Sequence, residues 1–252
     1  MADLRPRSSS ELLDAVFEIY RRHFLILMAV SVFTAVFTAI ASYMTDRSVA
    51  AVSLASVYNS LLVRFAGIFV APFTYGAVAY TASAAYLGKP VELGDAVHAV
   101  FVHPLRLMFT MVYVALLTAL GLLLFIVPGL FVFKRYFAVL MVLLFEDRGI
   151  RESLKRSHEL SNGNGRQIFG LIGAVLVFVA IASAFLVGAA APLLHGLPLE
   201  VAGLVIYTLG TPFATIAATV LYYDIRIRRE GYDIELMTRD LDAAPLALHP
   251  SI

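Results

Sequence analysis

Long windows without a charged residue constrain this fold most. A helix needs about 20 predominantly apolar residues, each rising about 1.5 Å, to cross a hydrocarbon core about 30 Å thick. Only 15% of the 252 residues are charged and 60% are hydrophobic, against about 25% and about 45–50% in soluble domains. We therefore expect an integral membrane protein. The uncharged windows are residues 24–45, 65–88, 107–133, 136–145, 167–199 and 201–223.

The two middle windows together are about as long as two spans. Pro128-Gly129 lies near the middle of the whole stretch 107–145, and Pro-Gly is a turn signal. This predicts a tight hairpin, with one helix ending at Val127 and another starting near Leu130. Each hairpin crosses the membrane twice. With an even number of spans, both termini lie on the same side. The predicted spans are about 24–45, 62–88, 106–127, 130–146, 167–190 and 201–224.

Lys and Arg are distributed unevenly between the two sides of this arrangement. Fifteen lie on the side of the termini, and the other side holds only Arg47, Arg64, Lys134 and Arg135. Because cytoplasmic loops carry the excess of Lys and Arg, we expect both termini to be cytoplasmic. Residues 1–23 then form a cytoplasmic N-terminal segment, 24–226 the membrane domain, and 227–252 a cytoplasmic tail.

An internal repeat accompanies these spans. Residues 11–26, ELLDAVFEIYRRHFLI, resemble residues 92–107, ELGDAVHAVFVHPLRL, and residues 151–170 take the same place before a later span. Pro72-Phe73 recurs 140 residues later as Pro212-Phe213. We predict an all-α bundle of three units, each an interfacial helix in the headgroup plane followed by two spans. The alternative is that unrelated hairpins merely look alike.

The sequence offers no recognisable catalytic or metal-binding pattern. It has no cysteine, and none of its six histidines forms an i, i+4 pair. We therefore expect no catalytic residue, no metal and no cofactor. A net charge of +1 also argues against nucleic acid as a partner.

Charges inside or beside the spans are the best candidates for a site. An intramembrane cation costs about 2.5–3.5 kcal/mol on insertion scales, which makes Lys134 and Arg135 functional candidates. They could instead snorkel to the outer headgroups. Glu146 follows on nearly the same helical face, about 16 Å from Arg135. Arg151, Lys155 and Arg156 could contact anionic lipid, at about 1 kcal/mol per residue.

The second charged group follows the last span. Asp224 and Arg228 are spaced i, i+4 and can pair, and Gly231 can end the helix. We interpret this group as a clasp that ties the last helix to the cytoplasmic segments, and we expect salt bridges from it to residues 146–160. Its members are Asp224, Arg226, Arg228 and Glu230.

These segments resemble the glycerophosphoryl diester phosphodiesterase membrane domain family. The likeness covers nearly the whole chain and is carried by LYYDIRIRREGYDIELM (221–237), by the opening ELLDAVFEIYRRHF and by a central block. That block holds Pro128, Gly129, Arg135, Glu146, Gly149, Arg156, Ser157, Leu160 and Gly163. The resemblance implies a multi-pass protein of the bacterial inner membrane. It does not imply phosphodiesterase activity, because the catalytic barrel of some relatives needs about 200 further residues.

Three function classes remain open. The first is a non-enzymatic scaffold or assembly module that contacts anionic lipid, with a membrane-protein partner or a second copy. The alternative is a transporter or lipid-handling protein with a polar site near Arg135. An intramembrane hydrolase ranks last, since Glu146 and Asp147 at a helix end are commonly just solvated.

Overall fold

The computed structural model describes residues 5–46, 54–232 and 234, and all regular structure in these ranges is helical. This confirms the predicted all-α membrane bundle. The helices are α1 (Ser9–Arg22), α2 (Phe24–Asp46), α3 (Leu54–Tyr86), α4 (Leu93–Phe101), α5 (Pro104–Leu124), α6 (Ile126–Tyr136), α7 (Val139–Phe145), α8 (Ile150–Ser161), α9 (Gly165–Ala190) and α10 (Leu197–Glu230).

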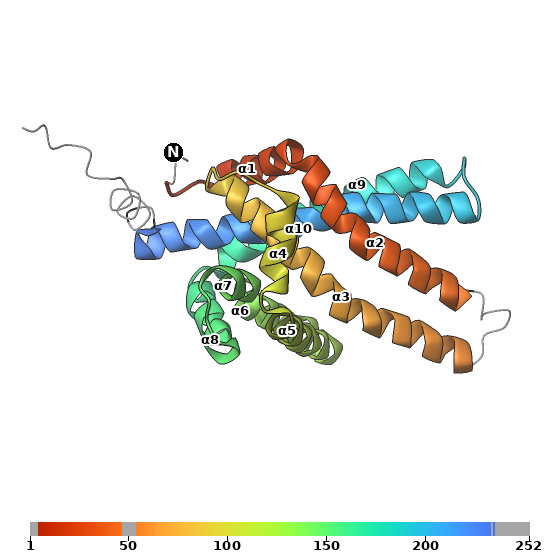
Figure 1. The fold of residues 1–252 in the computed structure, drawn as a ribbon, viewed down its shortest axis with the longest axis horizontal. Coiled ribbons are helices and arrows are strands. Elements are labelled where there is room, and N and C mark those ends of the chain that lie inside the picture. Colours follow the sequence, from red (N-terminus) through yellow and green to blue (C-terminus); the bar gives the residue numbers. More distant parts are fainter. Residues whose placement is uncertain (1–4, 47–53, 233, 235–252) are drawn as a thin grey trace, which may run out of the picture.

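The helices form three units, each a short helix followed by a hairpin. Helix α1 precedes α2–α3, α4 precedes α5 and α6–α7, and α8 precedes α9–α10. In Figure 1 the α2–α3 and α9–α10 hairpins extend toward the same side, while α5–α6 is seen more end-on. The predicted division into three units is therefore confirmed.

Five helical stretches in the described ranges are long and apolar enough to cross a membrane. Helices α1 and α2 meet at a bend of 81°, and this pair makes a sixth span if it is counted as one broken span. The chain is thus built as a multi-pass membrane protein. The five stretches are Gly67–Tyr86, Pro104–Leu124, Ile126–Phe145, Gly165–Ala190 and Val201–Glu230.

Each short helix packs against the second helix of a different unit. Helix α4 lies on α3, α1 lies on α10, and α8 lies on α6 and α7. The repeated Pro-Phe pair sits at two of these contacts: Phe73 stacks on Phe101 of α4 at 5.4 Å, and Phe213 stacks on Tyr20 of α1 at 4.1 Å. The repeat therefore reappears as a repeated packing contact.

Helices α3 and α10 cross at equivalent positions of their units. The hydroxyls of Ser83 and Tyr223 are 2.6 Å apart in a buried hydrogen bond, and these residues are also 140 apart in sequence. Small residues let the two backbones approach there, as in other membrane helix pairs. The fully buried ones include Ala79, Ala82, Ala217 and Thr219.

The turn of the middle hairpin differs from the prediction. Helix α5 ends at Leu124, Phe125 is extended, and α6 already begins at Ile126, so Pro128 lies in its first turn. Proline fits there because first-turn N–H groups have no partner within the helix. Gly129 serves close packing instead of a loop: a Cβ on Gly121 would lie 2.9 Å from its Cα.

The apolar face of α1 is also placed differently than expected. Leu12, Val16 and Ile19 are buried inside the protein against α10, α9 and α3, where we expected a face turned to lipid. Because α1 covers the bundle, its apolar face is satisfied by helices. Helix α4 keeps part of the predicted character, since Val97 and Phe101 remain exposed whereas Val100 is buried against α3.

Candidate functional site

The charges around Glu146 form a closed network at the Arg-rich end. The Glu146 carboxylate accepts hydrogen bonds from Tyr222 Oη at 2.9 Å, Arg156 Nε at 3.0 Å and Arg148 Nε at 2.8 Å. Arg156 also contacts Glu230 at 2.6 Å, which is the salt bridge predicted between the C-terminal charges and residues 146–160. The network therefore joins α7, α8 and α10.

Every charged group of this network has a partner of opposite charge within it. Burial lowers the pKa of Arg156, but its contacts with Glu230 and Glu146 outweigh burial and raise the pKa above the ordinary value. Arg226 adds a further contact to Glu230 at 3.1 Å. With Arg148, three guanidinium groups thus share the two carboxylates, which fits a structural role for these residues.

Asp224 is the fully buried member of the predicted clasp. Its side chain is 0% exposed, and it accepts hydrogen bonds from the Arg7 backbone N–H at 2.9 Å, Gln167 Nε2 at 2.6 Å and Arg228 Nε at 2.7 Å. Arg228 also donates to the Arg7 carbonyl. Asp224 therefore ties the N-terminal segment and the start of α9 to α10.

The remaining predicted lipid contacts on α8 are exposed. Lys155 lies 3.9 Å from Glu159 one turn away, in a surface pair. Arg151 is exposed on the same helix. Nothing in this geometry builds a site around them, and their contact with anionic lipid stays a prediction.

Lys134 and Arg135 do not lie where the sequence placed them. The Lys134 side chain rests against Gly165 at the start of α9, 3.4 Å from where a Cβ would lie. The Arg135 carbonyl accepts a hydrogen bond from Ser157 Oγ of α8 at 3.1 Å. The sequence placed both on the side of Arg47 and Arg64, whereas the structure sets them beside α8 and the start of α9, because α8 folds back along α7 and α6.

These two cations lack the compensation found around Glu146. Among the described residues neither Lys134 nor Arg135 has a carboxylate within 4.0 Å, and Arg135 Nε is buried without a hydrogen-bond partner. Glu146 binds other arginines, so no Arg135–Glu146 pair forms. Arg135 does not line the apolar cavity of the bundle either.

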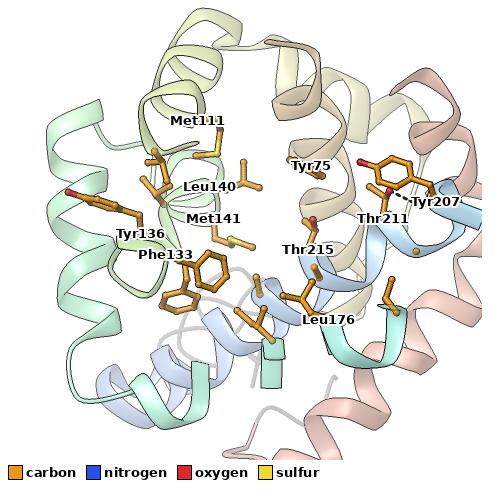
Figure 2. A pocket seen from close by; sticks show the side chains of 18 of the residues that line it. Tyr75, Met111, Phe133, Tyr136, Leu140, Met141, Leu176, Tyr207, Thr211 and Thr215 are labelled. Atoms are coloured by element: carbon orange, nitrogen blue, oxygen red, sulfur yellow. Dashed lines mark hydrogen bonds between the residues drawn. The ribbon is translucent and has the colours of Figure 1, made fainter. Parts of the chain in front are cut away.

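That cavity lies between the three hairpins and has a volume of about 460 Å³ (Figure 2). It is partly open, and its walls come from α3, α5, α6–α7, α9 and α10. Most of the wall is apolar. The lining side chains are Tyr75, Met111, Val114, Phe133, Tyr136, Phe137, Val139, Leu140, Met141, Ile172, Leu176, Val179, Ser183, Tyr207, Gly210, Thr211, Ala214, Thr215 and Ala218.

The polar groups of the cavity are all neutral. Tyr75 and Tyr207 both line it, and Thr211 donates to the Tyr207 carbonyl at 2.9 Å, the dashed line in Figure 2. Ser183 and Thr215 add hydroxyls. The wall can therefore hold an apolar chain and hydrogen-bond an uncharged group, but it offers no partner for an ion.

Small residues on α10 create this space. Gly210 lets α9 come close, since a Cβ there would lie 2.8 Å from Val179 Cγ1. Ala214 and Ala218 follow at spacings of four and leave the wall shallow. Sequence reasoning missed this site because Gly210, Ala214 and Ala218 carry no charge and form no recognisable motif. The adjacent threonines were the available signal.

Comparisons of this chain with protein-family models, with curated proteins and with solved structures find no match. The cavity, the closed charge network and the two uncompensated cations therefore carry the functional argument.

Proposed function

We propose that this chain is a non-enzymatic, multi-pass protein of the bacterial inner membrane that handles lipid, binding an apolar lipid chain between its hairpins. The observation that carries this proposal is the cavity of about 460 Å³. Small-molecule sites typically measure about 300–1,000 Å³ and are lined by apolar and aromatic side chains with a few polar groups. This cavity fits both criteria.

The position of the cavity favours a membrane molecule as its occupant. All its walls belong to helices that are apolar enough to cross a bilayer. A chain entering from the bilayer would meet Met111, Met141 and Leu176, while an ester or hydroxyl group could reach Tyr75 and Tyr207. Methionine side chains adapt to chains of different shape.

The distribution of basic residues supports cytoplasmic termini. With Lys134 and Arg135 beside α8 and α9, only Arg47 and Arg64 of the original four are left for the opposite side. Positive charge on cytoplasmic segments sets the orientation of such proteins. The resemblance to the glycerophosphoryl diester phosphodiesterase membrane domain family fits the same membrane and orientation.

One pair of substitutions tests the proposal. Ala214→Phe fills the cavity, whereas Ala180→Phe adds the same ring to an exposed position of α9 outside the lining. Native mass spectrometry of the protein, released gently from membranes, counts the lipids retained. We expect the Ala214→Phe protein to lose the tightly retained lipid and the Ala180→Phe protein to keep it.

Equal retention by both variants and wild type would contradict the proposal and leave a scaffold or assembly module as the better reading. If Ala214→Phe does not fold, wild type alone still decides, because a wild-type protein that retains no lipid has no filled cavity. A partner protein co-purifying in place of lipid would likewise favour the scaffold.

A further inference from the structure

A second apolar groove lies on a different face of α6. It has a volume of about 260 Å³ and is lined by Val127, Leu130, Phe131, Lys134 and Phe169. The residues of α6 that line the large cavity, Phe133 and Tyr136 among them, do not take part. The groove is therefore a separate feature between α6 and α9.

Lys134 supplies the charge in this groove. Its Nζ lies 5.5 Å from the centroid of the Phe131 ring and 3.6 Å from the Cβ position of Gly165. Gly165 is the first residue of α9, so the ammonium sits beside the positive end of that helix dipole. The positive end of the α9 dipole repels a cation in this place unless an anion binds beside it.

The start of α9 does not provide that anion. Its first turn has no acidic residue and contains Arg166. Asn164 does not cap the helix, because its amide donates to the Leu160 carbonyl at 2.8 Å. Among the described residues no carboxylate pairs with Lys134, so positive charge accumulates at one end of an apolar groove.

We propose that this groove binds an anionic phospholipid, with its phosphate at Lys134 and an acyl chain along Val127, Leu130, Phe131 and Phe169. Charge complementarity selects the headgroup, and the apolar wall selects the chain. The site goes beyond the cavity function: its occupant is held by a charged head, whereas the large cavity has neutral polar groups only.

The test compares Lys134→Gln with a matched control, Lys89→Gln, which removes an exposed lysine between α3 and α4. Each protein is purified in detergent and titrated with phosphatidylglycerol or with phosphatidylcholine, and the thermal midpoint and bound lipid are measured. We expect phosphatidylglycerol to stabilise wild type and Lys89→Gln. Its affinity for Lys134→Gln should fall about fivefold, the loss of about one basic contact.

Unchanged phosphatidylglycerol affinity in Lys134→Gln would overturn the proposal. Glycerol phosphate, which lacks acyl chains, should not stabilise wild type; stabilisation equal to that by the lipid would make this an anion site without a lipid. If Lys134→Gln does not fold, Phe169→Ala tests the acyl wall and should lower the same affinity. Ala214→Phe leaves this groove intact, so the two proposals fail independently.

Discussion

Two groups of charged residues at the same end of the molecule differ in one respect. Glu146, Arg156 and Glu230 bind one another across three helices, and Asp224 is enclosed by three donors. Lys134 and Arg135 lie nearby without a carboxylate partner in the described part of the chain. The comparison teaches that charge density alone does not mark a site. What matters is whether the charges are already satisfied.

Substitutions in the two groups should therefore affect different properties of the protein. Removing one partner of a buried ionic contact leaves the others desolvated and unpaired. Removing a cation without a carboxylate partner should take little from the stability of the folded protein, because only a contact with an aromatic ring is lost. Substitutions in the first group should cost stability, and substitutions in the second should cost ligand binding.

The largest effect is expected for Asp224→Ala. It would leave the Arg7 N–H, the Gln167 amide and Arg228 without their acceptor, at a cost of about 3–5 kcal/mol. The measurement is the free energy of unfolding from titration with a denaturing detergent. Asp14→Ala, an exposed acidic position on α1, is the control and should change stability little. A small loss for Asp224→Ala would mean that the enclosed carboxylate does not hold the three segments together.

A smaller loss is expected for the Arg156–Glu230 contact, whose side chains are 16% and 28% exposed. A double-mutant cycle with Arg156→Gln and Glu230→Gln should give a coupling of about 2 kcal/mol, as for hydrogen bonds to charged groups. The same cycle on the exposed pair Lys155–Glu159 should give about 0.3–0.5 kcal/mol. Equal couplings would show that α8 is not anchored through this network.

The capping box at the start of α1, in which Ser8 and Glu11 bond each other's backbone N–H, should make the stability of the protein depend on pH. Hydrogen bonds from the Ser8 backbone and side chain, with Arg5, lower the pKa of Glu11 from 4.5 to about 2. Because the folded pKa is the lower one, this stabilisation is present above pH 4.5 and is lost as the pH falls toward 2. Between pH 5 and about pH 3, the thermal midpoint of Glu11→Gln should depend less on pH than the thermal midpoint of wild type. Identical pH profiles would show that Glu11 does not hold the start of α1.

The smallest change in stability is expected for Lys134→Gln in uncharged detergent without anionic lipid. Since Lys134 has no carboxylate partner to lose, the free energy of unfolding should stay within about 0.5 kcal/mol of wild type. A loss comparable to that of Asp224→Ala would place Lys134 in the structural group and remove the contrast between the two.

The sequence predicted those parts of the fold that depend on crossing the bilayer and on local residue spacing. Uncharged windows gave the spans, and Pro72-Phe73 with Pro212-Phe213 indicated two equivalent helices that now prove to contact short helices in the same way. The i, i+4 spacing gave the Asp224–Arg228 contact, at 2.7 Å.

The features that could not be predicted from the sequence depend on how the helices pack against one another. Lys134 was misplaced because a straight hairpin puts it near the far headgroups, whereas α8 folds back and brings α9 beside it. The turn at Phe125 was missed because Pro-Gly suits a helix start as well as a loop. The cavity was missed because no local pattern states which helices stay apart.

Photocrosslinking with a phospholipid that carries a reactive group on its acyl chain tests the cavity most directly. Met141 is 1% exposed and lines the cavity, while Phe185 is 75% exposed on α9 and meets bulk lipid. We expect crosslinks to peptides containing Met141 as well as Phe185, with only the Met141 crosslink lost in Ala214→Phe. Crosslinks confined to Phe185 and other outward positions would contradict a lipid chain between the hairpins.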